Sequence, residues 1–253
     1  PASATDMYNT AVGFAAGEAI TVGVQNTFIG SLSGDATTTA SNNTAVGYNS
    51  LSVNTTGASN VAVGKDALTA NTTASNNIAI GVDAATAITT GGSNVAIGTS
   101  ALQTATTAAN NTAIGTSSLA ANTSGTANVA VGYAALDANT TGGSNTALGS
   151  SALGANTTGS NHTAVGKDAL LVSTAAGYDT AIGDSVLKAN TTGNYNTGVG
   201  ASALAANTTT SNHTAVGYAA LSSNTTGSSN TAVGKDSMRA TTTGTRNVAV
   251  GNA

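Results

Sequence analysis

The chain contains no cysteine and no tryptophan, a single proline, and only 3% aromatic residues among its 253. Without cysteine it can form neither a disulfide nor a thiolate metal site, so cysteine usage does not indicate a redox compartment. Charged residues make up 6%, and the net charge is −4 with six scattered Lys and Arg, which argues against a nucleic-acid-binding surface. No apolar run approaches the ~20 residues of a membrane-spanning helix.

The N-terminal end carries neither an initiator methionine nor a basic stretch followed by an apolar one, as a signal peptide would. The C-terminal end shows no atypical repeat of the kind that covers the exposed edge of a free-standing solenoid. We therefore expect 1–253 to be a single repeat domain and a segment of a longer fibre protein.

Ala, Thr, Asn, Gly and Ser dominate what is present, a composition that would suggest disorder in an aperiodic chain. A glycine nevertheless recurs every seventeen residues without insertion, from Gly13 to Gly251. It ends a phrase such as Asn60-Val61-Ala62-Val63-Gly64. A fixed period of this length is typical of a solenoid whose coils stack on one another.

The typical coil, counted from the Asn of that phrase as position 1, is seen in residues 128–144. Positions 2 to 4 are rich in β-forming residues and end at glycine, which predicts a short strand and a corner. A second short strand is expected around Ala135-Leu136, and the Asn-Thr-Thr-Gly segment that follows has turn chemistry. The predicted fold is all-β: a parallel β-solenoid of about fifteen 17-residue coils.

Position 4 is Val, Ile or Leu in all fifteen coils, and position 9 is Leu in ten. Stacked about 4.8 Å apart, these residues would form two apolar ribs inside a rod about 70 Å long. Position 1 is Asn in twelve coils, replaced by His162, Asp179 and His213. Stacked Asn side chains can hydrogen-bond along such a ladder. The expected ribs include Val46, Val63, Ile80, Ile97, Leu51, Leu68, Leu136 and Leu153, and the expected ladder includes Asn43, Asn60, Asn77, Asn94, Asn111, Asn128 and Asn145.

Position 3 is Ala in thirteen coils, with Phe28 and Gly198 as exceptions. Side chains alternate along a strand, so if Val63 points into the coil then Ala62 points out of it. A column of small residues facing outward favours close approach of another surface, and we expect copies of the chain to associate there. The expected self-association face consists of Ala45, Ala62, Ala79, Ala96, Ala113, Ala130, Ala147, Ala164, Ala181, Ala215 and Ala232.

The phrase Asn-Val-Ala-Ile-Gly at 94–98 and its variants resemble the head repeats of trimeric autotransporter adhesins and similar repeats in tail-fibre-like proteins of phages and environmental bacteria. The resemblance implies a left-handed parallel β-roll, three chains about one axis, and a surface-exposed adhesive or structural fibre. The coil here is longer by the Asn-Thr-Thr-Gly segment, and the chain lacks a coiled-coil stalk and membrane anchor. Bacterial and viral owners both stay open.

Residues for catalysis or cofactor binding do not converge in the sequence. Asp66, Asp83, Asp168 and Asp236 share position 7, which we assign to an exposed turn. His162 and His213 lie three coils apart, about 14 Å, too far to share a metal. A Gly-x-Gly-x-x-Gly loop and the nine-residue repeat of calcium-loaded β-rolls are absent. We expect no enzymatic activity, no cofactor and no metal.

The sequence thus favours a non-enzymatic extracellular fibre module, a rigid rod at a cell or virion surface. Its expected partners are copies of itself, as homotrimer or filament, with a cell-surface or glycan receptor as a further candidate. Tyr48, Tyr133 and Tyr218 at position 6 are either sugar-stacking groups or scattered surface tyrosines. Alternatives are a phage tail-fibre segment and an ice-binding solenoid with Thr columns at positions 13 and 14.

Asn-x-Thr/Ser sequons recur at Asn54, Asn71, Asn122, Asn139, Asn156, Asn190, Asn207 and Asn224.

Overall fold

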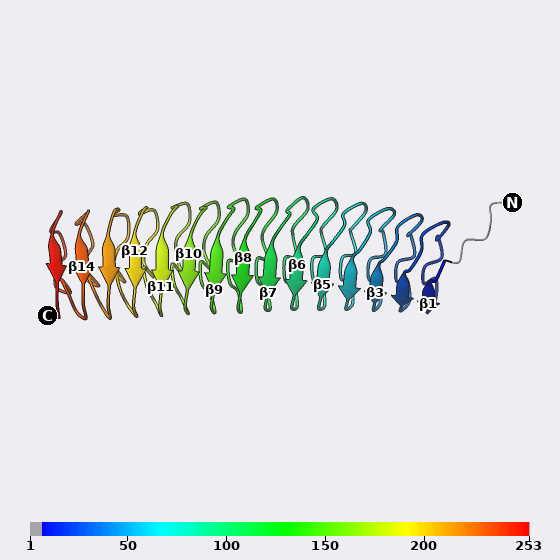
Figure 1. The fold of residues 1–253 in the computed structure, drawn as a ribbon, viewed down its shortest axis with the longest axis horizontal. Coiled ribbons are helices and arrows are strands. Elements are labelled where there is room, and N and C mark those ends of the chain that lie inside the picture. The colour runs from blue at the N-terminus through cyan, green and yellow to red at the C-terminus, as the bar shows by residue number, and fades with distance from the viewer. Residues whose placement is uncertain (1–6, 253) are drawn as a thin grey trace. The chain divides into compact units, whose positions relative to one another are not determined.

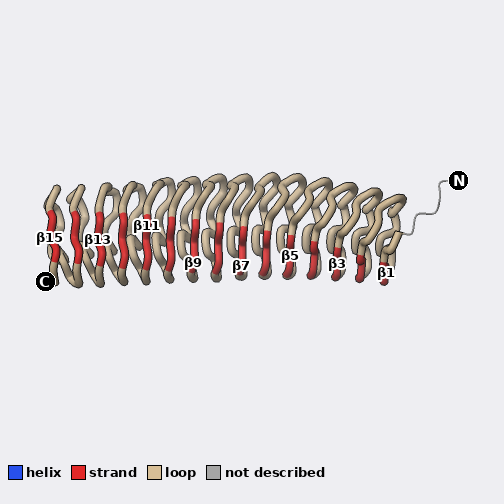
Figure 2. Tube along the Cα trace, viewed as in Figure 1, coloured by secondary structure: helices blue, strands red, loops and turns tan. Residues whose placement is uncertain are grey.

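The computed structural model describes residues 7–252 and contains short parallel strands joined by turns, with no helix among those residues (Figures 1 and 2). The chain forms two compact units, Pro1–Ser124 and Gly125–Ala253. The first holds β1 (Thr10–Val12), β2 (Thr27–Ile29), β3 (Thr44–Val46), β4 (Val61–Val63), β5 (Ile78–Ile80), β6 (Val95–Ile97) and β7 (Thr112–Ile114). The second holds β8 (Val129–Val131), β9 (Thr146–Leu148), β10 (Thr163–Val165), β11 (Thr180–Ile182), β12 (Thr197–Val199), β13 (Thr214–Val216), β14 (Thr231–Val233) and β15 (Val248–Val250).

Each strand pairs in parallel with the next strand of its unit, in strict 17-residue register. In β4, the backbone N–H of Val61 donates to Asn77 in the following coil, and that of Gly64 donates to Val46 in the preceding one. Because the repeat has no insertion, the coils within each unit repeat the same strand hydrogen bonds to their neighbours. The predicted parallel β-solenoid is confirmed, while the single-domain expectation remains a prediction.

The expected second strand is wrong, because Ala135-Leu136 and the equivalent steps form turns. Positions 7, 9 and 17 have positive φ even though most are not glycine, as at Asp66 (φ 57°), Leu68 (φ 51°) and Ser59 (φ 58°). An extended segment cannot contain such residues. The backbone hydrogen bonds between coils continue through the turns, as where Leu68 donates to Ala84 at 3.1 Å.

The period-defining glycine closes the strand at a corner. At Gly64 φ is +132°, a conformation that L side chains rarely adopt, and an added Cβ would collide with the carbonyl oxygen of Gly81 in the next coil. Both backbone conformation and close stacking therefore require glycine at position 5.

The core of each coil is narrow. The Leu column of position 9 is fully buried, including Leu51, Leu68, Leu136 and Leu153. The small side chains of position 3 are buried beside the Leu column, so a large residue in one column is matched by a small residue in the other. In the first two coils Gly17 and Gly34 replace the usual Leu, and Phe28 at position 3 occupies the vacated space.

Candidate functional site

The prediction that the Ala column of position 3 faces outward is wrong. Ala45, Ala62, Ala79, Ala96, Ala113, Ala130, Ala147, Ala164, Ala181, Ala215 and Ala232 are all 0% exposed within the single chain. They point into the coil, where the Leu column leaves room only for a small side chain. The position 4 residues accordingly point outward, so Val46, Val63, Ile80 and Ile97 are not core residues.

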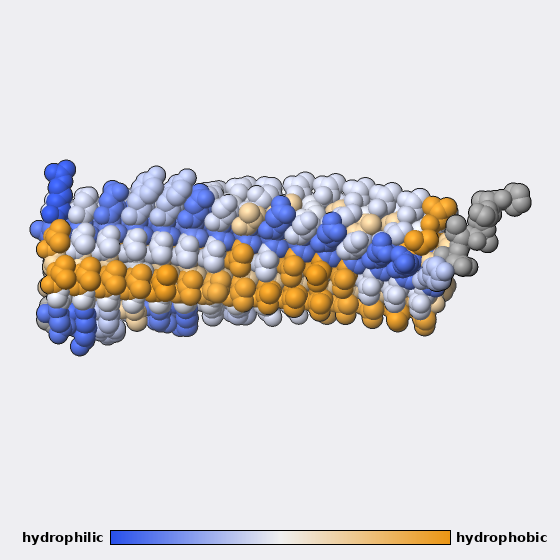
Figure 3. Space-filling view, in the orientation of Figure 1, coloured by the Kyte–Doolittle hydropathy of each residue, from blue (hydrophilic) through white to orange (hydrophobic). Residues whose placement is uncertain are grey.

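The outer face of the sheet, defined here as positions 2 and 4 of the strands, contains no charged residue and has an aliphatic column at position 4. Position 4 carries Val, Ile or Leu throughout, and position 2 carries Thr in ten coils and Val or Ile in five. Ile78 and Ile80 in β5 are 37% and 38% exposed. Within each unit the Val, Ile and Leu side chains of this face produce the orange band of Figure 3, whereas Thr is pale.

The outer face is most aliphatic from β4 to β6, where Val61, Ile78 and Val95 replace Thr at position 2. There both columns consist of hydrocarbon side chains, since position 4 contributes Val63, Ile80 and Ile97.

The Thr columns at positions 13 and 14 differ in their surroundings. At position 13 the hydroxyl donates to the carbonyl oxygen of the same position in the next coil, as from Thr55 to Thr72 at 3.1 Å and from Thr72 to Thr89 at 3.2 Å. Thr56 at position 14 is exposed. The position 13 hydroxyls therefore hold coils together and do not form a free array for ordering water.

The predicted Asn ladder is present and buried. The backbone N–H of Asn60 donates to Asn43 Oδ1 at 2.9 Å, and Asn60 Oδ1 accepts from the backbone of Asn77 at 2.9 Å. Asn60 Nδ2 donates to the carbonyl oxygen of Ala74, also at 2.9 Å. Each Asn thus supplies an acceptor that points to the next coil and a donor that satisfies a turn carbonyl.

A second buried Asn column, not predicted as structural, lies at position 12. Asn54 Nδ2 donates to Gly57 O at 2.9 Å, and Asn71 Nδ2 donates to Asn54 Oδ1 at 2.9 Å. The eight sequon asparagines are all 0% exposed. Their recurrence in Asn-Thr-Thr-Gly was the available signal, because a turn that repeats in register stacks its side chains in register too.

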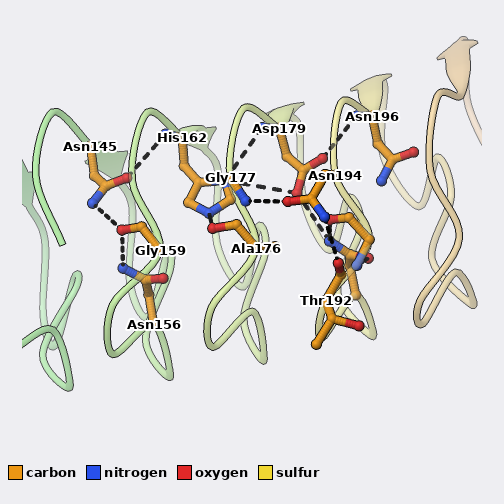
Figure 4. A network of polar contacts seen from close by, with 12 residues as sticks. Asn145, Asn156, Gly159, His162, Ala176, Gly177, Asp179, Thr192, Asn194 and Asn196 are labelled. Atoms are coloured by element: carbon orange, nitrogen blue, oxygen red, sulfur yellow. Dashed lines mark hydrogen bonds and ion pairs between the residues drawn. The ribbon is translucent and has the colours of Figure 1, made fainter.

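His162 replaces Asn in the first ladder without changing its hydrogen-bonding pattern (Figure 4). Its backbone N–H donates to Asn145 Oδ1 at 3.0 Å, and its Nδ1 accepts from the backbone N–H of Asp179 at 3.4 Å. Its Nε2 lies 2.8 Å from the carbonyl oxygen of Ala176, to which a neutral ring donates the Nε2 hydrogen. The ring therefore reproduces the acceptor and the donor of an Asn amide.

Asp179 occupies the next rung. Its Oδ1 accepts from the backbone of Asn196 at 2.8 Å and its Oδ2 accepts from Asn190 Nδ2 at 3.1 Å. Asp179 Oδ2 also lies 3.8 Å from His162 Nδ1, and both side chains are 0% exposed. Burial lowers the pKa of His162 to about 4 and raises the pKa of Asp179 to about 7, because each charged form loses its hydration.

His213 occupies a rung without an acidic neighbour. Its Nδ1 accepts from the backbone N–H of Asn230 at 3.3 Å, and its Nε2 lies 2.9 Å from Thr210 Oγ1 and 3.2 Å from Asn224 Nδ2. Burial again lowers the pKa of the ring, opposed by hydrogen bonding to the backbone of Gly227 and Asn230.

The remaining candidate residues lie apart on the surface. Asp66 pairs with its neighbour Lys65 at 3.0 Å on a surface turn, which agrees with the turn expected for the aspartates of position 7. Tyr48, Tyr133 and Tyr218 are 52%, 64% and 54% exposed. Within residues 7–252, no group of three or more His, Cys, Asp and Glu is placed to hold a metal ion, and no helix could span a membrane.

One aromatic contact was not predicted. Tyr178 and Tyr195 occupy position 17 of adjacent coils, and their rings stack with centroids 5.3 Å apart and an interplanar angle of 14°. Both side chains are more than half exposed. Their identical position in consecutive repeats was the signal in the sequence.

Comparison with family models, curated proteins and solved structures finds no match to the chain. The resemblance of its repeat phrase to adhesin heads and tail-fibre proteins therefore remains a prediction.

Proposed function

We propose that this chain is a non-enzymatic structural module of an extracellular fibre, which associates with copies of itself through the outer face of its sheet. The observation that carries the proposal is the uncharged column of Val, Ile and Leu that position 4 presents to solvent in every coil. Solvent alone would accept polar residues there. A second copy of the same repeat offers a matching apolar surface at the same spacing.

The size of the face is consistent with association between copies. Fifteen strands of three residues, about 4.8 Å apart and about 10 Å long, present roughly 700 Å² in all. A stable interface buries about 800 Å² on each partner, slightly more than the outer face offers, so association must use all of its strands and some flanking residues. A closed trimer and a lateral filament both satisfy this requirement.

Rigidity supports the same function. Each coil is tied to its neighbours by backbone hydrogen bonds, the Asn ladder and the position 13 hydroxyls, so bending within a unit would break several of these bonds at once. A stiff repeat presents exposed groups such as Tyr48 at fixed intervals, and weak contacts of this kind gain strength by multivalency. On the resemblance of its repeat, we assign the module to a cell or virion surface, with an adhesive role toward a glycan as one use.

Ice binding is a second candidate, favoured by a different observation from the one in the sequence. Position 2 places Thr on the outer face in ten coils, beside the methyl groups of position 4. A regular array of hydroxyl and methyl groups on a stiff sheet can order water. Thermal hysteresis by the purified protein would favour this function over self-association, because both use the same face.

The test of self-association compares two exposed aliphatic residues two positions apart. Ile80→Arg places a charge on the outer face, whereas Val82→Arg places one at position 6, away from the strand; the native side chains are 38% and 44% exposed. Both variants should fold. Analytical ultracentrifugation should show an oligomeric wild type and Val82→Arg, and a shift of Ile80→Arg toward monomer. A monomeric wild type, or equal assembly of the two variants, would exclude this interface.

A further inference from the structure

The three ionisable residues within the buried Asn ladder all lie in the second unit, in the coils that begin with β10, β11 and β13. His162, Asp179 and His213 are each 1% exposed. The structural function proposed above does not use their ability to titrate. Their hydrogen bonds nevertheless depend on protonation state, because a backbone N–H of the next coil points at a ring nitrogen of each histidine.

The neutral ring is the only form that fits the rung. Asn230 N–H donates to His213 Nδ1 at 3.3 Å, so Nδ1 must be without hydrogen and the ring proton must be on Nε2. Protonation would place a second N–H on Nδ1, facing the N–H of Asn230. Two donors would then oppose each other in a buried site, and the rung between the coils of β13 and β14 would break.

We propose that His213 is an acid-sensitive joint of the solenoid, whose protonation opens the ladder between the coils of β13 and β14, and that Asp179 exempts His162 from the same response. The difference between the two histidines lies in what surrounds them. The groups that face His213 are Thr210, Asn224 and the backbone of Gly227 and Asn230, none of which carries a negative charge. On the coil packed against His213, the charged residues Lys235 and Asp236 pair with each other at 3.7 Å on an exposed turn.

The pair His162–Asp179 should be insensitive to acid because its two protonation changes offset each other. Folding lowers the pKa of His162 from 6.5 to about 4, so stability from this group is present above pH 6.5 and lost as the pH falls toward 4. Folding raises the pKa of Asp179 from 3.8 to about 7, so stability from this group is present below pH 3.8 and lost as the pH rises toward 7. Between about pH 4 and pH 6.5 the unfolded pair holds one proton, on His162, and the folded pair also holds one, on Asp179. The pair therefore makes no net contribution to the pH dependence of stability in this range.

His213 has no such compensation. Its pKa is lowered from 6.5 in the folded chain, so its contribution to stability is complete above pH 6.5 and is lost as the pH falls below that value. The acid response of the second unit should therefore start at the coils of β13 and β14.

Amide hydrogen exchange of matched glycines tests the proposal in the intact chain. Gly234 N–H donates to Val216 across the His213 joint, and Gly183 N–H donates to Val165 across the His162–Asp179 joint, at 2.8 and 2.7 Å. Rates in each variant are compared with the wild type at the same pH, which cancels the intrinsic pH dependence of exchange. All variants introduce Asn, the residue that twelve coils already use at this position, so they should fold.

In His213→Asn, the opening constant at Gly234 should stay low in acid, whereas in the wild type it should rise by up to tenfold per pH unit below pH 6.5. Gly183 should be insensitive in the wild type. Asp179→Asn should make Gly183 sensitive to acid, and His162→Asn should instead make it lose protection as the pH rises from 4 to 7. The same pH profile at Gly234 in wild type and His213→Asn would overturn the joint, and an insensitive Gly183 in Asp179→Asn would overturn its compensation by Asp179.

Discussion

Gly198→Ala should destabilise the second unit, and Val186→Ala should rescue it. Gly198 stands in the position 3 column where thirteen coils have Ala, and Val186 stands at position 8 of the preceding coil, where most coils have Ala or Ser. A Cβ on Gly198 would lie 2.5 Å from Val186 Cγ1. The two exceptional residues therefore compensate for each other's volume across the boundary between coils.

The magnitudes follow from packing. The overlap in Gly198→Ala costs about 1–3 kcal/mol, because the branched Val186 cannot rotate away in a close-packed core, and about 0.4–1 kcal/mol is regained from reduced freedom of the unfolded chain. Val186→Ala removes two buried methyl groups beside a glycine and leaves a cavity, at about 2 kcal/mol. The double variant recreates the Ala–Ala pair of Ala169 and Ala181, so its stability should lie within about 1 kcal/mol of the wild type.

The assay is a double-mutant cycle on the local free energy of opening. Hydrogen exchange of the Gly200 amide, which donates to Ile182 at 2.8 Å and so joins β12 to β11, reports that quantity. A local probe is needed because repeat proteins open segment by segment, so a single unfolding midpoint does not describe them. The coupling between the two substitutions should reach about 2 kcal/mol. Additive losses would refute the inward orientation of the position 3 column.

Two further substitutions test the ladder and the corner. Asn60→Ala should cost about 1–3 kcal/mol, because it leaves the Asn77 backbone N–H unpaired in a buried site and removes one of the two donors to the Ala74 carbonyl oxygen, the other being Asn71 Nδ2; the exposed Thr56→Ala is the control, and equal thermal stability of the two variants would contradict the structural role of the ladder. Gly64→Ala should cost more than about 3 kcal/mol, because it combines a forbidden φ with collision against backbone that cannot move aside; unchanged exchange protection at Gly81 would contradict the stacking.

The architecture could be predicted from the sequence because it depends only on the spacing of the repeat. A glycine that never leaves its 17-residue step requires coils that repeat in register, and a buried polar residue such as Asn60 requires the same partner in every coil. The Leu column and the Asn ladder follow from this regularity, since both are set by spacing alone.

The orientation of the strand could not be derived from spacing. In a strand of three residues, the alternation of side chains does not decide whether Ala62 or Val63 faces inward. Hydrophobicity alone favours the larger residue as the core residue. The deciding information was in the exceptions. Phe28 occurs where Gly17 and Gly34 replace Leu, and this compensation of volume is possible only if positions 3 and 9 share one interior.

The second buried Asn column has a consequence for biosynthesis. Asn54, Asn71 and their equivalents are acceptors for an oligosaccharyltransferase in the extended chain, but in the folded coil the same Nδ2 atoms are enclosed and donate to carbonyl oxygens. A sugar attached there before folding would prevent the coil from closing. In a secretory pathway that glycosylates nascent chains, folding and glycosylation of this repeat would therefore compete for the same nitrogen atoms, and each modified coil would interrupt the stack.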